Sequence, residues 1–208
     1  MKPTIGVILR PDKNITNKDV QIIYKNIYNT LISYSDIYVI GIINDNSSLD
    51  LVNICDGFIL QGGNEATDFD YEIVKKCYDL DIPILGICLG MQIIGEVFNG
   101  NLKEINENTH NLSSTHPITI YNNTKLFDII GDYNINVNSR HKYEIKKPNL
   151  LISARSNDGV IEAIEDPTKN FFIGVEWHPE DMFDDKYCKK LFDVFVNSSK
   201  SFHNKKRH

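Results

Sequence analysis

A cysteine flanked by glycines is the first residue in this sequence whose surroundings could support chemistry. Residues 83–92 read PILGICLGMQ, an apolar strand pattern that passes through Gly86, Cys88 and Gly90 into a helix pattern. A nucleophile with glycine two residues before and two after it is typical of a nucleophile elbow, where strand and helix pack closely. The positive end of the helix favours a thiolate, and the first free N–H, that of Leu89, can donate to an oxyanion. Cys88 is therefore the candidate nucleophile, although this motif alone also fits an inert cysteine in a close-packed turn.

A histidine and a glutamate form the second candidate motif, in IGVEWHPE at residues 173–180. The strand pattern ends at Trp177, and Pro179 is expected to keep the backbone extended, because its φ is restricted and it disfavours helical backbone before it. Residues two apart in an extended segment face the same side, so the Glu180 carboxylate can orient the His178 imidazole. Imidazole titrates near neutral pH, which makes His178 the candidate base and acid. A histidine in a surface turn is the alternative.

Paired glycines follow another predicted strand, in DGFILQGG at residues 56–63. Ligands of an open parallel sheet collect at the carboxyl ends of its strands, which places Gly62 and Gly63 beside Cys88. A backbone without Cβ atoms approaches a substrate oxygen closely, so an N–H group here and that of Leu89 would complete an oxyanion hole. Each such donor is worth about 3 kcal/mol in a transition state. An ordinary turn after a strand is the alternative.

Strand and helix patterns alternate along the first half of the chain and predict an α/β fold with a parallel sheet and helices on both faces. The expected strands are Thr4–Leu9, Ile37–Ile43, Gly57–Leu60 and Pro83–Ile87, and the expected helices are Asn17–Tyr34, Leu49–Ile54, Ala66–Leu80 and Leu89–Phe98. The second half predicts short strands, several of them antiparallel, at Ile118–Tyr121, Tyr133–Val137, Leu150–Ala154, Val160–Glu165 and Phe171–Glu176, then an amphipathic helix at Asp185–Ser199. No repeat or linker pattern separates these segments, so residues 1–208 are expected to form one domain.

Composition and charge narrow the function classes. The chain is 41% hydrophobic and 24% charged, which is typical of a globular protein rather than a disordered one. Its net charge of -6 argues against nucleic acid as a partner, since phosphates require a surplus of Lys and Arg. The basic tail, residues 205–207, is interpreted as a frayed terminus. No secretory or membrane-spanning pattern is evident, so a cytoplasmic location is expected. None of the four cysteines forms a CxxC pair, which argues against a zinc knuckle or a thioredoxin-like motif.

Taken together, LQGG, GICLGMQ and GVEWHPE resemble the motifs of class I glutamine amidotransferases, in the same order and over most of the chain. VNSRH at residues 137–141 and DGVIEAIE at residues 158–165 further resemble the γ-glutamyl hydrolase branch, the peptidase C26 group that includes γ-glutamyl-γ-aminobutyrate hydrolase. The resemblance implies the flavodoxin-like fold of that superfamily. It also implies cleavage of a γ-glutamyl amide bond through a thioester intermediate, with release of glutamate and an amine.

Roles follow from the resemblance at matching positions. Cys88, His178 and Glu180 would form the catalytic triad, and the N–H groups of Gly63 and Leu89 would hold the oxyanion. Four further residues would bind the substrate: Gly62, Gln92, Ser139 and His141. The pattern departs from the hydrolase branch where Leu89 and Lys142 replace its usual Arg and second His.

Two other functions stay open. GICLGMQ is also similar to the glutaminase component of imidazole glycerol phosphate synthase, so a glutaminase that supplies ammonia to a synthetase partner is the first alternative. A non-catalytic regulatory binding module is the second. The expected partner is a small γ-glutamyl substrate, without nucleic acid or membrane; a homodimer stays open. No organic cofactor is expected, because nucleotide-binding glycine motifs are absent from the sequence. No metal is expected either, because His110, His116 and His203 show no ligand-like spacing; these histidines are expected at the surface.

Overall fold

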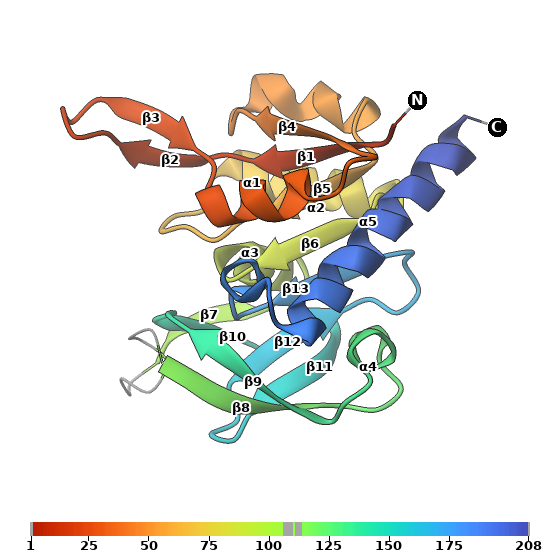
Figure 1. Cartoon of the computed structure of the whole chain (residues 1–208). Coiled ribbons are helices and arrows are strands. Elements are labelled where there is room, and N and C mark those ends of the chain that lie inside the picture. Colours follow the sequence, from red (N-terminus) through yellow and green to blue (C-terminus); the bar gives the residue numbers. More distant parts are fainter. Residues whose placement is uncertain (1, 106–109, 111–113, 208) are drawn as a thin grey trace.

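A nine-stranded sheet runs through the centre of the molecule, with helices packed on both of its faces (Figure 1). The computed structural model describes residues 2–105, 110 and 114–207. The strand order is β4-β1-β5-β6-β13-β12-β11-β8-β9. The strands are β1 (Thr4–Ile8), β4 (Tyr38–Ile42), β5 (Gly57–Leu60), β6 (Ile84–Ile87), β8 (Ser114–Ile120), β9 (Asn134–Ser139), β11 (Leu151–Ser156), β12 (Ile161–Glu165) and β13 (Phe172–Val175).

Strand pairing changes direction in the middle of this sheet. Every neighbouring pair from β4 to β13 is parallel, and every pair from β13 to β9 is antiparallel. The register sets Gly86 of β6 beside Gly174 of β13 and aligns the carboxyl ends of the two strands. The predicted parallel sheet with an antiparallel section in the second half is confirmed, and both sections belong to one sheet.

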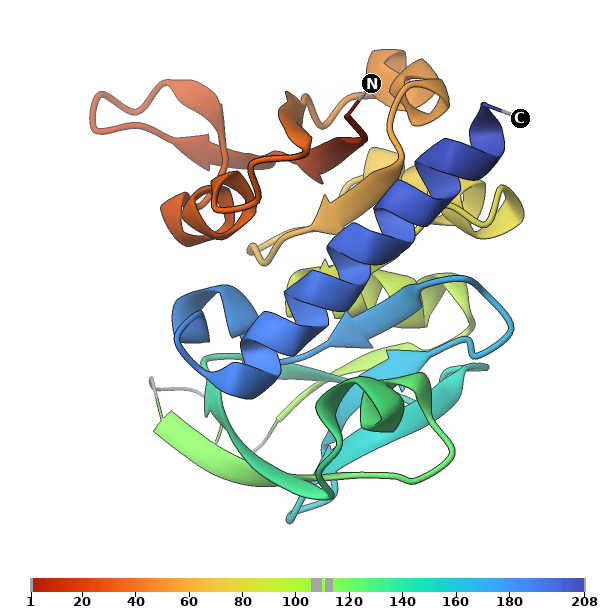
Figure 2. The same ribbon diagram turned by 45° about the vertical axis from the view of Figure 1, so that its right-hand side comes forward.

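Two apolar layers cover the sheet. The helices are α1 (Lys25–Ile32), α2 (Asp68–Asp79), α3 (Leu89–Val97), α4 (Lys125–Ile130) and α5 (Lys186–Lys206), with short 3-10 helices η1 (Asn46–Asn53) and η2 (Pro179–Met182). One layer joins α1, α4 and α5 to Ile59 of β5, and the other joins η1, α2 and α3 to Phe58 and Leu60 of the same strand. Neighbouring strand residues point to opposite faces, so central parallel strands are apolar throughout. Figure 2 shows α5 running across the first face.

The predicted helix over residues 17–34 is wrong in its first part. Strands β2 (Arg10–Lys13) and β3 (Asp19–Ile22) form an antiparallel hairpin there, and α1 begins only at Lys25. Asn17, with φ of 58°, turns the chain between the strands. The Gln61 side chain then bonds to Ile22 O and to Tyr24 N, which holds the end of the hairpin against β5. A helical spacing of apolar residues cannot anticipate these long-range bonds.

Two smaller differences concern local structure. Strands β7 (Asn101–Glu104) and β10 (Tyr143–Lys146), which the sequence patterns do not predict, form a separate antiparallel ribbon. Helix α5 continues beyond the predicted end at Ser199 to Lys206, whose ammonium contacts Asn53 O; the basic tail is therefore largely helical rather than frayed. All four cysteines are free and buried. Among the described residues, no helix has the length and apolar character needed to cross a bilayer.

Candidate active site

The structure brings the three predicted motifs together at one edge of the sheet. Strands β5, β6 and β13 lie side by side and parallel, so the segments that follow them meet at their carboxyl ends (Figure 1). Gly62 lies between the other two motifs. A Cβ atom on Gly62 would lie 2.9 Å from His178 Cε1 and 3.7 Å from Cys88 Cβ. The cysteine and the imidazole thus flank a glycine backbone, an arrangement suited to acyl transfer.

Cys88 occupies a strained turn between β6 and α3. Its φ of 51° and ψ of -109° lie in a region that non-glycine residues rarely adopt, and such strain is concentrated at functional sites. The turn is held by a hydrogen bond from Cys88 N to Val175 O at 2.8 Å. Close packing explains the flanking glycines: a Cβ on Gly86 would lie 2.7 Å from the Gly90 backbone, and one on Gly90 would lie 2.1 Å from Leu60 O.

The thiol of Cys88 lies in a setting that disfavours the thiolate. Burial raises the pKa of Cys88 well above its usual value, and the nearby Glu176 carboxylate raises it further. The backbone N–H of Leu89 opposes these effects by lowering the pKa. Burial outweighs the hydrogen bond, so the thiol is neutral at rest, and its proton must pass to a base as the sulfur attacks.

His178 is fixed from two sides. Its Nδ1 lies 2.7 Å from Glu180 Oε1, and both side chains are buried. A carboxylate only accepts hydrogen bonds, so Nδ1 carries the proton and Nε2 is left with a lone pair. The Asn138 side chain clamps the histidine backbone, since its Oδ1 accepts from His178 N at 2.8 Å and its Nδ2 donates to His178 O at 3.0 Å. The imidazole is therefore held in one orientation, with Nε2 as the acceptor of its neutral form.

The backbone between His178 and Glu180 differs from the extended segment predicted. Pro179 begins the 3-10 helix η2. Proline is well suited to the first position of a helix, where its missing N–H has no partner to lose. His178 itself stays outside the helix, with φ of -108° and ψ of 84°, and the imidazole still meets the carboxylate. Arg140 lies beyond them, with Nη2 at 3.8 Å from Glu180 Oε1 and Nη1 paired with Asp181.

Gly63 lies beside the first residue of α3. A Cβ on Gly63 would lie 3.1 Å from Leu89 Cδ2 and 2.9 Å from Arg10 Cδ. The buried Arg10 guanidinium donates twice to Gln61 O and pairs with Asp70 Oδ1 at 2.6 Å, which fixes the loop that carries the glycines. A rigid glycine backbone next to a helix N-terminus is the geometry an oxyanion hole requires.

A cavity of about 740 Å³ opens in front of Cys88, and Gly63, Leu89, Gln92 and His141 contribute to its lining. The amide of Gln92 is held at the wall, because its Nε2 donates to Glu176 Oε1 at 2.6 Å. A volume of this size suits a small-molecule substrate. Among the described residues, Gly62, Ser139, His178 and Glu180 do not line it.

Ser139 lies away from the cavity, because its hydroxyl donates to His110 O at 2.9 Å. The expectation that the other histidines lie at the surface is wrong for His110 and His203, which are 2% and 7% exposed, and His116 is half-buried. His203 Nδ1 pairs with Asp56 Oδ2 at 2.8 Å, which ties α5 to the start of β5.

Comparison with known proteins gives the family. The family model described as Peptidase C26 matches residues 64–180, more than half of the chain. The chain belongs to the peptidase C26 family. Its membership of the class I glutamine amidotransferase superfamily, predicted from the three motifs, is confirmed.

Relatives of this C26 protein agree with that placement. A glutamine amidotransferase-like protein of Rickettsia prowazekii is 30% identical, over 72% of this chain and 79% of its own. A CTP synthase of Lactobacillus johnsonii is 28% identical over 83% of this chain, which spans only 39% of that enzyme. Two solved structures share the fold. A Thermoplasma acidophilum protein described as a GMP synthase component has a TM-score of 0.78 and 21% identity, over 100% of this chain and 99% of its own. The Trypanosoma brucei CTP synthase glutaminase domain with bound acivicin has a TM-score of 0.75 and 16% identity, over 96% of this chain and 94% of its own.

Four residues of this C26 protein support the site without having been identified from the sequence. Arg10 and Asn138 hold the backbones of the glycine loop and of His178. Arg140 lies beside Glu180, and Glu176 lies near Cys88 and accepts a hydrogen bond from Gln92. Their only signal in the sequence is nearness to a motif, for Glu176 within GVEWHPE and for Asn138 and Arg140 within VNSRH. Arg10 has no such signal, because its partners lie more than fifty residues away.

Proposed function

We propose that this chain hydrolyses a γ-glutamyl amide bond and releases glutamate and an amine. One observation carries the proposal: a His178–Glu180 pair at 2.7 Å that lies, with Cys88, around the backbone of Gly62. Nucleophile, base and orienting carboxylate are the three parts of an acyl-transfer triad. Membership of the peptidase C26 family supports the same reaction class. A cytoplasmic location stays a prediction.

The proposed reaction has two halves. The Cys88 sulfur attacks the γ-amide carbon while its proton passes to Nε2 of His178, and the N–H groups of Gly63 and Leu89 bind the resulting oxyanion. His178 then protonates the amine as the C–N bond breaks, which leaves a γ-glutamyl thioester. Water gives a proton to His178 and attacks the thioester; collapse of that intermediate releases glutamate and restores the thiol. Glu180 stabilises the imidazolium in both halves.

The cavity residues have matching roles in this proposal. Gln92 and His141 line the space in front of the sulfur and would contact the glutamyl portion. Gly62 would contribute through its backbone. Ser139, whose hydroxyl is bound to His110 O, would act by holding the loop that carries His141 rather than by contacting substrate.

Similarity to CTP synthases favours a second candidate, a glutaminase that supplies ammonia to a synthetase partner. The two candidates differ in leaving group and in dependence on a partner. A panel of glutamine and several γ-glutamyl amines, assayed for glutamate release by the purified chain, separates them. Turnover of a γ-glutamyl amine by the chain alone supports the hydrolase; slow turnover of glutamine that a copurifying synthetase accelerates supports the glutaminase.

Substitution of the sulfur tests the nucleophile. Cys88→Ala is expected to lower kcat/KM on the order of 10⁶-fold, the scale seen when a triad loses its nucleophile. Cys77→Ala is the matched control, because Cys77 is equally buried and free but lies on α2 in the apolar layer. Glu180→Gln is expected to cost less, about 10²-fold, since His178 remains as the base.

Trapping the thioester tests the mechanism directly. Hydroxylamine added during turnover should give γ-glutamyl hydroxamate, and intact-protein mass spectrometry should show the glutamyl adduct on wild-type protein and on Cys77→Ala. Labelling by a glutamine-like electrophile should likewise require Cys88. An active Cys88→Ala protein contradicts the proposal. A folded wild-type protein that the electrophile leaves unlabelled supports the remaining alternative, a non-catalytic binding module.

A further inference from the structure

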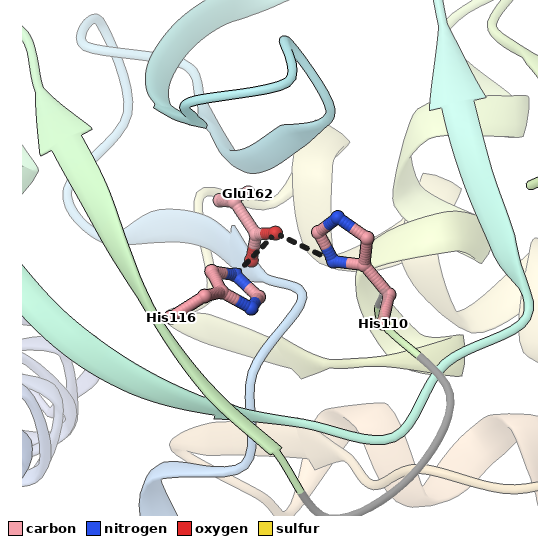
Figure 3. A group of neighbouring side chains, drawn as sticks. All are labelled: His110, His116 and Glu162. Atoms are coloured by element: carbon pink, nitrogen blue, oxygen red, sulfur yellow. Dashed lines mark hydrogen bonds and ion pairs between the residues drawn. The ribbon is translucent and has the colours of Figure 1, made fainter. Parts of the chain in front are cut away.

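Three buried or half-buried side chains converge at the antiparallel strands of the sheet. His110, His116 on β8 and Glu162 on β12 offer ring nitrogens and a carboxylate oxygen that all lie within 4.8 Å of one another. Figure 3 shows both rings turned toward the carboxylate. His116 Nε2 is 3.0 Å from Glu162 Oε1, and His110 Nδ1 is 3.6 Å from the same oxygen. His141 Nε2 is the nearest fourth donor, 3.1 Å from His110 Nδ1 and 3.8 Å from Glu162 Oε1.

We propose that this cluster binds one divalent transition-metal ion of the zinc class, through His110 Nδ1, His116 Nε2, Glu162 Oε1 and His141 Nε2. Zinc takes nitrogen and oxygen ligands at about 2.0–2.1 Å in a tetrahedron, so neighbouring donors stand about 3.3–3.4 Å apart. The four separations given above, from 3.0 to 3.8 Å, lie around that value. Imidazole and carboxylate ligands suit zinc and its neighbours rather than calcium or magnesium.

Tautomers of the two buried rings supply an independent argument. His110 Nε2 lies 2.9 Å from Asp158 Oδ2, and His141 Nδ1 lies 2.9 Å from Tyr143 O. Both partners are oxygens that only accept, so both of these nitrogens carry hydrogen. In their neutral forms the two rings therefore direct two lone pairs, on His110 Nδ1 and His141 Nε2, at each other across 3.1 Å. Two lone pairs that face each other repel, and a cation between the two nitrogens turns this repulsion into two favourable contacts.

Unpaired polar atoms in the cluster also indicate a bound cation. Glu162 is fully buried, and its Oε2 has no hydrogen-bond partner in the described part of the chain. His116 Nδ1 is likewise buried and unpaired there, which leaves it able to carry the proton while Nε2 coordinates. A buried carboxylate oxygen without a hydrogen bond is costly, and a cation bound to the same carboxylate offsets that cost. Ser139 does not relieve the cluster, since its hydroxyl donates to His110 O at 2.9 Å and lies 3.5 Å from Nδ1.

The surroundings also match a metal centre. Histidine ligands usually donate their other N–H to a carboxylate or carbonyl, as His110 does to Asp158 and His141 to Tyr143. A cavity of about 80 Å³ lined by His110, His116 and Asp158 provides an access route for the ion. The ion would join β8, β12 and the loop after β9, and His141 would link it to the cavity in front of Cys88.

Zinc binding by the full-length chain tests the inference without an activity assay. Chelator-stripped protein is titrated with zinc sulfate against a chromophoric chelator, and bound metal is counted by elemental analysis. Wild type is expected to bind one ion per chain, and its melting temperature is expected to rise with zinc. His116→Gln and Glu162→Gln should each lose the ion and the thermal shift, and Asp158→Asn should weaken binding about 10–100-fold.

Two controls separate this site from other histidines. His203→Gln alters a histidine outside the cluster and should bind as wild type does. The double variant Cys88→Ala/His178→Gln removes the active-site thiol and the one histidine of the other candidate group among the described residues, His178, Glu180 and Asp181, and should also keep the ion. The inference is overturned if stripped wild type takes up no stoichiometric zinc, if His116→Gln retains wild-type binding, or if the ion disappears with the double variant.

Discussion

The closest backbone approach in the elbow predicts that Gly90→Ala will damage both stability and catalysis. The new Cβ would lie 2.1 Å from Leu60 O and 2.8 Å from Leu60 Cβ, whereas Cβ contacts below 3.0 Å essentially do not occur. Helix α3 and strand β5 must therefore separate by about 1 Å. Overpacking of this kind costs about 1–3 kcal/mol, and we expect the upper end because the obstacle is backbone. Alanine recovers about 1 kcal/mol through its higher helix propensity. The net loss is about 2 kcal/mol.

The same movement displaces the proposed oxyanion donor. Leu89 immediately precedes Gly90, so a shift of the first turn of α3 moves its N–H relative to the substrate. A misplacement of about 1 Å can cost 10²-fold in rate. We therefore expect kcat/KM to fall about 100-fold under conditions where the variant is still folded.

Urea unfolding followed by circular dichroism measures the first effect, and glutamate release below the unfolding transition measures the second. Gly41→Ala on β4 is the matched control. Its Cβ would meet only the Leu9 side chain, at 3.1 Å, and a side-chain terminus can move aside. A Gly90→Ala protein with wild-type stability and activity would refute the argument that close approach of α3 and β5 shapes the elbow.

Two further predictions concern charge. Arg10→Met leaves the buried Asp70 without its ion-pair partner and should lower the free energy of unfolding by about 3–5 kcal/mol, measured by urea unfolding. The double variant Arg10→Met/Asp70→Asn should recover part of this loss. A double variant as unstable as Arg10→Met would contradict the pairing. Burial raises the pKa of Cys88, so its thiolate fraction keeps growing as the pH rises past the ordinary cysteine value of about 8.5. Iodoacetamide should therefore inactivate the free protein at a rate that is still increasing at pH 9. Cys88→Ala is the control and should carry no label at residue 88. A rate that reaches a plateau near pH 7 would show an already ionised thiol and contradict the prediction.

Residues close together in the chain allowed the elbow and the triad motifs to be predicted. Gly86, Cys88 and Gly90 lie within five positions, and strand-to-helix turns of this kind require the same residue types wherever they occur. The parallel half of the sheet was predictable for a related reason. Its central strands are buried on both faces and appear as unbroken apolar runs, such as GFIL in β5.

Long-range contacts decided the features that the sequence patterns missed. The apolar spacing over residues 17–34 favours a helix, yet Gln61, which directly follows β5, bonds to Ile22 at the end of the β2–β3 hairpin and to Tyr24 just after it. Pro179 begins a turn of 3-10 helix next to His178, and Asn138, forty residues earlier, holds the backbone of that histidine.

The sequence by itself determined which atoms are available for chemistry: one sulfur in a glycine-flanked turn, one imidazole with a carboxylate two residues on, and glycine backbone after a buried strand. Tertiary structure alone decided which of the remaining histidines meet. His110, His116 and Glu162 have no ligand-like spacing in the chain; the pairing of β8, β11 and β12 brings His116 near Glu162, and His110 reaches them from outside these strands. Local motifs can be predicted because residues close in sequence are also close in space. A buried cluster whose residues come from distant segments depends on the register of the whole sheet.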